Sequence, residues 1–282
     1  MPDQHPGQGK IPVLTIEAGK SRQRYAKDLW HYRELLLFLA WRDILVRYKQ
    51  TVLGILWSLL RPLLTMIVFT VVFGRLARLP SGNNPYPVLV FAAMIPWQLF
   101  ANALTETSGS LISNANLIAK IYFPRLVIPI ASVLVTLIDF IISLFLLVGL
   151  MAIFHAWPSW RALFVPLFLL LGLFLALGCG LWFAALNVRY RDFRYIVPFI
   201  VQFGLYVSPV GFSSAIVPDR WRLIFSLNPM AGVIDGFRWA LLRGQGELYW
   251  PGLALATVST SLIFIGGLLY FRRVERSFAD FI

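Results

Sequence analysis

The sequence is poor in the residue types that most catalytic sites, metal sites and disulfide-linked folds depend on. Its 282 residues include one cysteine, Cys179, and three histidines. A single cysteine cannot form an internal disulfide, and the histidines are too scattered to ligate a metal together: His5, His31 and His155. The motifs G-x-x-x-x-G-K-[ST], H-E-x-x-H and G-x-S-x-G do not occur. The chain therefore has no P-loop for ATP and no recognisable catalytic or metal-binding motif.

Charge is also scarce. Charged residues make up 13% of the chain, hydrophobic residues 59%, and the mean hydropathy is +0.73. A soluble domain of this length does not need so much apolar surface, so the composition indicates an integral membrane protein. The apolar runs are continuous and near or above ~20 residues, unlike the ~10-residue alternating strands of a membrane barrel. We therefore predict an all-α integral membrane protein.

Six apolar runs predict six transmembrane helices within a transmembrane domain at 51–271. Their approximate bounds are 51–73, 88–108, 126–154, 162–186, 196–212 and 251–271. Residues 1–28 lack the apolar core of a signal peptide and are predicted to be a flexible cytoplasmic tail; residues 272–282 form a second, short tail. Most Lys and Arg residues fall on one side of this layout, which puts both termini in the cytoplasm. This bias explains the net charge of +12 without a nucleic-acid partner.

Two further segments are amphipathic. Residues 29–50 have an apolar core too short to span, with Trp30 and Trp41 beside cationic flanks, and are predicted to form a helix in the interface plane. That helix is either a simple anchor or a collar beside a partner. Residues 213–250 are predicted to form short external, re-entrant helices, because Asn228 and Pro229 suit a helix start. In that region Arg238 is expected on the polar side.

Two charges lie deep inside predicted spans, and a third, Glu106, lies near the end of the second span. Arg61 and Asp139 fall about equally deep in the first and third spans, where a central charge costs ~2.5–3.5 kcal/mol on insertion scales. We predict that they pair, either for a structural or for a functional purpose. The fourth span carries a cluster of small residues, which predicts close helix packing near the centre of the bundle: Gly172, Ala176, Gly178 and Gly180.

The segment SLISNANLIAKIYFPRLVIP, at 110–129, connects two spans on the predicted cytoplasmic side. Its polar side chains alternate with apolar ones. Such a short amphipathic connector can dock a soluble partner and pass its motion to the membrane domain, or it can rest on lipid headgroups. The residues alone leave both interpretations open.

Several stretches together resemble one family. They are LGILWSLLRPL at 53–63, NANLIAKIYFPRLVIP at 114–129, NVRYRDFRYIVPF at 187–199, SPVGF at 208–212 and NPMAGVIDGFRWALL at 228–242. In this order they resemble the permease subunit of ATP-binding-cassette exporters for cell-surface polysaccharides, a family that includes O-antigen, capsule and teichoic-acid exporters. The resemblance runs from about residue 30 to the C-terminus.

The resemblance implies a catalytically silent transport subunit in a bacterial inner membrane. Two copies of the chain would pair with two copies of a separate cytoplasmic ATPase, and ATP and Mg would bind to that partner rather than to this chain. The N-terminal amphipathic helix and the 110–125 segment would contact the ATPase, the latter as a coupling helix. Its candidate coupling residues are Asn114, Asn116, Lys120, Phe123 and Arg125.

The resemblance also implies that the first and fifth spans line the pore, through which a lipid-linked polysaccharide such as O-antigen would pass. Aromatic rings can stack on the C–H faces of sugars, and Arg61 is suited to bind a phosphate or carboxylate on the substrate. The candidate pore-lining residues are Trp57, Arg61, Phe199, Phe203 and Tyr206. Packing between helices or against lipid is the alternative role for each aromatic residue.

Other functions remain open at this point. An ATP-driven exporter of drugs or small lipids would share the architecture. A secondary transporter would need more buried ionisable residues or an internal repeat than we find. A membrane-embedded glycosyltransferase would need a carboxylate cluster or metal motif near one interface, and we find neither.

Overall fold

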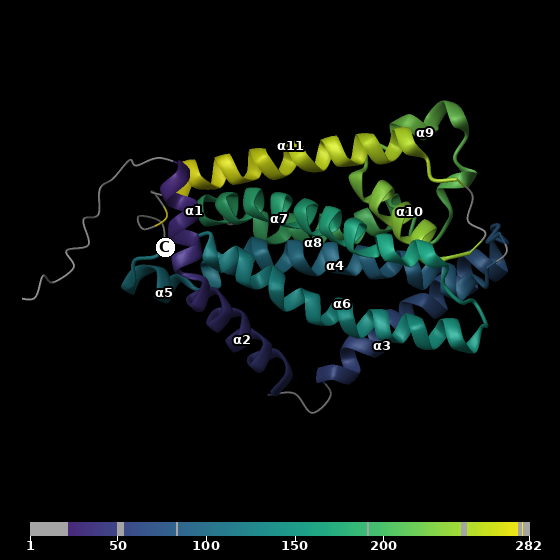
Figure 1. Ribbon diagram of the computed structural model, residues 1–282, viewed down its shortest axis with the longest axis horizontal. Helices are drawn as coiled ribbons and strands as arrows, with labels where there is room; N and C mark the ends of the chain where they lie inside the picture. The colour runs from purple at the N-terminus through teal and green to yellow at the C-terminus, as the bar shows by residue number, and fades with distance from the viewer. Residues whose placement is uncertain are drawn as a thin grey trace, which may run out of the picture.

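The computed structural model describes residues 22–49, 54–82, 84–190, 192–243, 247–275 and 278. Side chains are described from residue 27 in the first range and from residue 59 in the second. Throughout this part of the chain the regular structure is helical, without a strand, which confirms the predicted all-α class. The long helices lie roughly side by side in one elongated bundle (Figure 1).

Five helical segments are long and apolar enough to cross a membrane. They are α3 (Gly54–Phe69) with the π-helix η1 (Thr70–Leu76), α4 (Tyr86–Ser113), α6 (Val127–Ile153), the 3-10 turn η2 (Trp160–Phe164) with α7 (Val165–Arg189), and α11 (Trp250–Val274). They correspond to the first, second, third, fourth and sixth predicted spans. The chain is thus a multi-pass membrane protein.

The fifth predicted span, 196–212, is shorter in the structure. Helix α8 (Phe193–Val207) has 15 residues, fewer than the ~20 that a span needs. The helix ends before Pro209, whose ring disfavours helical backbone at Ser208, and Val210 and Gly211 follow in a turn. The sixth crossing therefore stays a prediction.

Helix α4 is the centre of the bundle. Of its most apolar 18-residue stretch 83% is buried, far more than in any other of the five spans. Helix α7 packs against α4 and α11 through the predicted small residues. A Cβ on Gly180 would lie 2.7 Å from Thr107 Cβ in α4, and a Cβ on Gly178 would lie 2.7 Å from Phe264 Cα in α11. These contacts confirm the close packing expected of the fourth span.

Short helices gather at the two ends of the bundle (Figure 1). Helices α1 (Arg22–His31) and α5 (Ala115–Lys120) lie at one end, beside the last turns of α11. The 3-10 turn η3 (Ser214–Ile216), α9 (Asp219–Phe225) and α10 (Pro229–Leu241) belong to the other end. Helix α1 begins inside the segment predicted to be a flexible tail, and residues 1–21 lie outside the described part.

The segment predicted as one interface helix, 29–50, is divided. Helix α1 lies across the ends of the long helices, whereas α2 (Arg33–Lys49) runs obliquely along the bundle and packs on α6 (Figure 1). The interface orientation therefore suits α1 and not α2. The physical reason is that Arg47 and Tyr48, in the last turn of α2, bind the carboxylate of Asp139 half-way along α6 and so hold α2 against the bundle.

Candidate functional site

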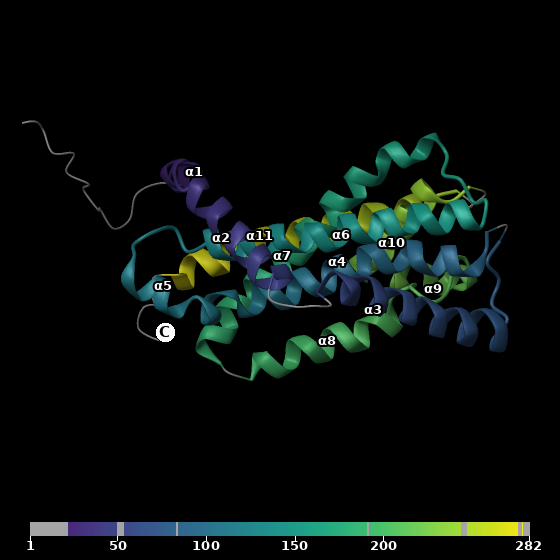
Figure 2. The same cartoon turned by 90° about the horizontal axis from the view of Figure 1, so that it is seen from below.

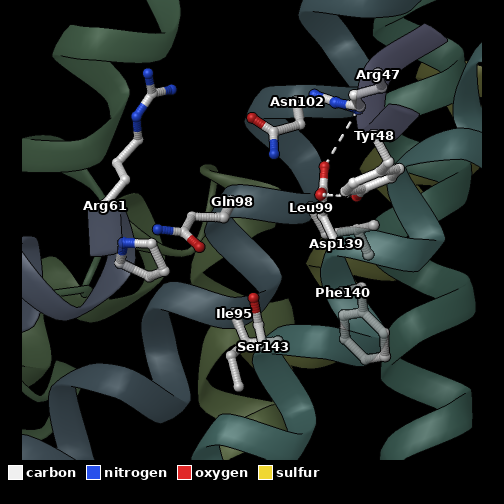
Figure 3. A pocket seen from close by; sticks show the side chains of 11 residues that line it. Arg47, Tyr48, Arg61, Ile95, Gln98, Leu99, Asn102, Asp139, Phe140 and Ser143 are labelled. Carbon is white, nitrogen blue, oxygen red and sulfur yellow. Dashed lines mark hydrogen bonds and ion pairs between the residues drawn. The ribbon is translucent and has the colours of Figure 1, made fainter. Parts of the chain in front are cut away.

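A polar cavity of about 260 Å³ lies between four helices (Figure 3). Helix α2 contributes to it near its C-terminal end, and α3, α4 and α6 contribute near their middles. The lining residues are Arg47, Tyr48, Arg61, Pro62, Ile95, Gln98, Leu99, Asn102, Asp139, Phe140 and Ser143. The cavity thus brings together both intramembrane charges that the sequence singled out.

One side of the cavity is a group of polar contacts around Asp139. The Tyr48 hydroxyl donates to Asp139 Oδ1 at 2.5 Å, and Arg47 Nη1 lies 3.2 Å from Asp139 Oδ2. Arg47 Nη2 also lies 3.4 Å from Glu106 Oε1 on α4. Burial and the hydrogen bond to Asp139 raise the pKa of the Tyr48 phenol, so it stays a donor at neutral pH. Helix α2 therefore compensates the charge of Asp139.

This arrangement corrects the predicted pair between Arg61 and Asp139. Figure 3 shows Arg61 on the opposite side of the cavity, and its guanidinium has no hydrogen bond or ion pair to any described residue. Asp139 pairs with Arg47 instead, because α2 packs alongside α6. The sequence placed Arg47 at the membrane surface and so could not identify it as the partner.

Three of the five predicted coupling residues hold the α4–α6 connection onto the bundle. Asn114 accepts from Arg42 Nη2 at 2.8 Å and donates to Ser110 O at 2.9 Å. Phe123 is 4% exposed. The Arg125 backbone N–H donates to Glu275 Oε1 at 2.8 Å, and its guanidinium donates to the Glu275 carbonyl.

The other two predicted coupling residues, Asn116 and Lys120, are exposed at the end of the bundle. Ile121 and Tyr122 follow them and are 54% and 70% exposed. We call Asn116, Lys120, Ile121 and Tyr122 the α5 face. The sequence marked the segment but could not separate its exposed residues from its anchoring ones.

A row of aromatic side chains lies along the exposed side of α8. Phe199, Phe203 and Tyr206, which we call the α8 aromatic row, are spaced by four and three residues and so share one helix face. The rings of Phe199 and Phe203 are stacked with centroids 5.9 Å apart. The ring centroid of Tyr206 lies 6.3 Å from that of Phe69 on α3. This contact links the two helices that were predicted to line the pore. The side chain of Trp57 lies outside the described part.

At the far end of the bundle, Arg238 is buried rather than on a polar surface, which corrects the sequence interpretation. It is 2% exposed, and its guanidinium donates to the carbonyls of Leu89, Val210 and Phe212 at 3.2, 2.9 and 2.6 Å. Burial lowers its pKa to about 10, which still leaves it charged at neutral pH. One side chain on α10 therefore fixes α4 and the turn after α8.

Asn228 reinforces this turn. Its side chain caps α10 by accepting from the Met230 N–H at 3.1 Å, as predicted, and donates to Ser208 Oγ at 2.9 Å. Tyr86 donates to the Gly211 carbonyl at 2.5 Å. The outer helices and the end of α8 thus form one hydrogen-bonded unit.

The sequence profile of the ABC-2 type transporter family matches residues 34–242. The chain belongs to this family. Among its relatives, this ABC-2 type transporter chain is similar to the O-antigen export system permease protein RfbA of Myxococcus xanthus, with 29% identity over 254 residues that cover 89% of this chain and 97% of the relative. The protein of the same name from Klebsiella pneumoniae is 28% identical, with 90% and 96% covered. The polysialic acid transport protein KpsM of Escherichia coli is 25% identical over 248 residues, with 85% and 92% covered.

The match to the ABC-2 type transporter family extends from α2 to the end of α10. It includes the cavity, the α5 face, the α8 aromatic row and the outer hydrogen-bonded unit. These four features therefore belong to the part of the chain that the family shares.

Proposed function

We propose that this chain is the membrane-spanning permease subunit of an ATP-driven exporter that moves a lipid-linked polysaccharide out across the bacterial inner membrane. The observation that carries the proposal is similarity over nearly the whole length of two proteins named as permeases of O-antigen export systems. The more distant relative is named for transport of another polysaccharide, polysialic acid.

The energy for transport would come from a partner. The sequence has no P-loop, so ATP and Mg would bind to a separate cytoplasmic ATPase, of which two copies would serve a pair of permeases. The α5 face is the docking surface that we propose for this ATPase. It combines an exposed ring, an exposed aliphatic side chain and a cation, and it lies at the same end as α1, which supports placing this end in the cytoplasm.

The pore would form between two copies of the chain. Figure 2 shows α3 and α8 on the same side of α4, and both helices expose apolar side chains there. Pairing two such sides would cover those side chains and enclose a path lined by the α8 aromatic row. In this assembly α8 and the turn after it would complete the sixth crossing.

The chemistry of the row suits a sugar polymer. Aromatic faces contact the C–H faces of saccharide rings through many weak interactions, and no single ring holds the polymer tightly. A chain of repeating sugars could therefore slide past successive rings. A small drug molecule would not require such a row.

A gene deletion tests the proposal. Cells without the permease should lose the polysaccharide from their surface and accumulate it on the inner side of the membrane, and plasmid-borne wild type should restore it. The accumulated material is measured by gel and antibody before and after permeabilisation. Unchanged surface polysaccharide together with altered resistance to drugs would contradict the proposal and favour the drug exporter. Export that continues when ATP is depleted and the proton gradient is kept would favour a secondary transporter.

A further inference from the structure

We propose that the cavity beside Arg61 binds a phosphate-type anion, of the kind found in phosphate or diphosphate lipid headgroups. The inference rests on the proposed function and deepens it, because it names the part of the substrate that this cavity would recognise.

Among the described residues, charge balance leaves Arg61 as the lining cation without a counter-charge. Asp139 is the one carboxylate among the lining residues, and it is already bound by Arg47 and Tyr48. Glu106 lies outside the lining and contacts Arg47 from there. Within the described residues, Arg61 therefore has no carboxylate to compensate it, although it lines the same cavity.

The position of Arg61 makes an unpaired charge expensive. It is the eighth residue of α3, which begins at Gly54 and continues through η1 to Leu76. Ionisable residues within membrane spans almost always face protein or a water-filled cavity and mark a substrate or ion pathway. Figure 3 shows its side chain extending in the direction in which α4 runs from Ile95 to Asn102, which is toward the end of the bundle that carries α5. A ligand that enters from that end would meet the guanidinium first.

The neighbouring groups suit a phosphate. A guanidinium presents a planar fork of N–H donors that matches two phosphate oxygens. Gln98 and Asn102 are four residues apart on α4, line the same cavity and carry amide donors, and Ser143 adds a hydroxyl. The volume of about 260 Å³ is below that of most drug-sized sites, at roughly 300–1,000 Å³, and it suits a headgroup better than a saccharide chain. The polymer itself would pass along the α8 aromatic row.

Binding by the purified full-length chain tests the site. The chain is placed in nanodiscs of phosphatidylcholine, and geranylgeranyl diphosphate is the probe, with the uncharged alcohol geranylgeraniol as its comparison. Native mass spectrometry measures occupancy. Wild type should bind the diphosphate at least about 10-fold more tightly than the alcohol, as expected for hydrogen bonds to a charged group.

The variants separate the site from general electrostatics. Arg61→Gln should weaken diphosphate binding by about 10- to 100-fold, and Arg61→Lys should weaken it less, because lysine keeps the charge but loses the fork. Arg75→Gln is the matched control, since Arg75 is an exposed arginine at the other end of the same span. It should bind like wild type. Size-exclusion profiles identify any variant that fails to fold. If Arg61→Gln does not fold, Arg61→Lys still tests the site.

Two further probes identify the source of the anion. Inorganic diphosphate that competes as well as the amphiphile would show that the headgroup alone is recognised. Phosphatidylglycerol that competes equally would make bilayer phospholipid the occupant. Both results support an anion site. Equal binding of diphosphate and alcohol, or equal losses in Arg61→Gln and Arg75→Gln, would overturn it.

The anion site and the exporter role can fail separately. If Arg61→Gln binds the diphosphate like wild type while the deletion strain loses surface polysaccharide, the anion site is wrong and the export function stands. If deletion leaves the surface polysaccharide intact but Arg61 still controls diphosphate binding, the transport proposal is the one that fails.

Discussion

Arg47 on α2 and Asp139 on α6 form an ion pair, with 3.2 Å between Nη1 and Oδ2, half-way along the membrane domain. Tyr48 adds a hydrogen bond to the same carboxylate at 2.5 Å. The N-terminal amphipathic region is thereby bound to the inside of the bundle, not only to its surface.

Tyr48→Phe should destabilise the protein by about 1–3 kcal/mol, because the carboxylate of Asp139 loses a buried donor. The measurement is thermal unfolding of the full chain in detergent. Tyr32→Phe is the control, since the Tyr32 hydroxyl makes no hydrogen bond to a described residue. Equal melting temperatures for the two variants would show that the Tyr48 bond does not hold α2 in place.

Gly178→Ala should destabilise the bundle by about 1–3 kcal/mol through overpacking. The new methyl would meet the backbone of Phe264 at 2.7 Å, so α7 and α11 would have to separate. Gly149→Ala places the same methyl in open space on α6 and should be neutral or slightly stabilising. The same unfolding assay compares them. A Gly178→Ala protein as stable as Gly149→Ala would contradict the close helix approach.

Arg238→Gln should lower stability by at least about 3 kcal/mol, because up to three carbonyl groups lose their charged donor. Limited proteolysis after residue 208 should become faster at the same time, since this arginine fixes the turn there. Arg243→Gln, which loses one exposed bond to the Pro158 carbonyl, is the matched control. If both variants resist protease equally, Arg238 is not the residue that holds the outer unit together.

Phe203→Ala should reduce the rate of polysaccharide export about 2- to 10-fold, as expected from the loss of one stacking contact, while leaving protein level and stability unchanged. Phe203 is exposed in the α8 aromatic row, so little packing is lost. Phe145→Ala removes an exposed ring from α6, at 74% exposure against 58% for Phe203, and should export normally. The rate is measured as the appearance of surface polysaccharide after induction. Equal rates in both variants would remove the α8 aromatic row from the export path.

The sequence predicted the features that depend on local pattern. Apolar length identified five spans, the glycines of the fourth span predicted its packing, and Asn228 with Pro229 predicted the start of α10. Each of these signals lies within one helix or at its end. Residues 110–129 were also recognised as a distinct connector, because their polar and apolar residues alternate between two long apolar runs.

The sequence could not predict relations that depend on how distant helices pack. Arg47 and Asp139 are far apart in the chain, and nothing local distinguishes Arg47 from a surface cation. Arg238 occurs in an amphipathic helix where a charge usually marks the solvated face, but both faces of α10 are covered. Within the connector, only packing shows that Phe123 is buried while Tyr122 is exposed.

We propose that this permease is driven by a separate ATPase that docks on the α5 face. Copurification in mild detergent tests it most directly. Tagged wild type should bring down an ATPase subunit in equal amount, and the double variant Lys120→Glu and Tyr122→Ala should lose most of it without unfolding. Trp157→Ala, an exposed aromatic change in the loop between α6 and η2, should retain it. A wild-type chain that purifies alone and transports in vesicles without ATP would contradict the account.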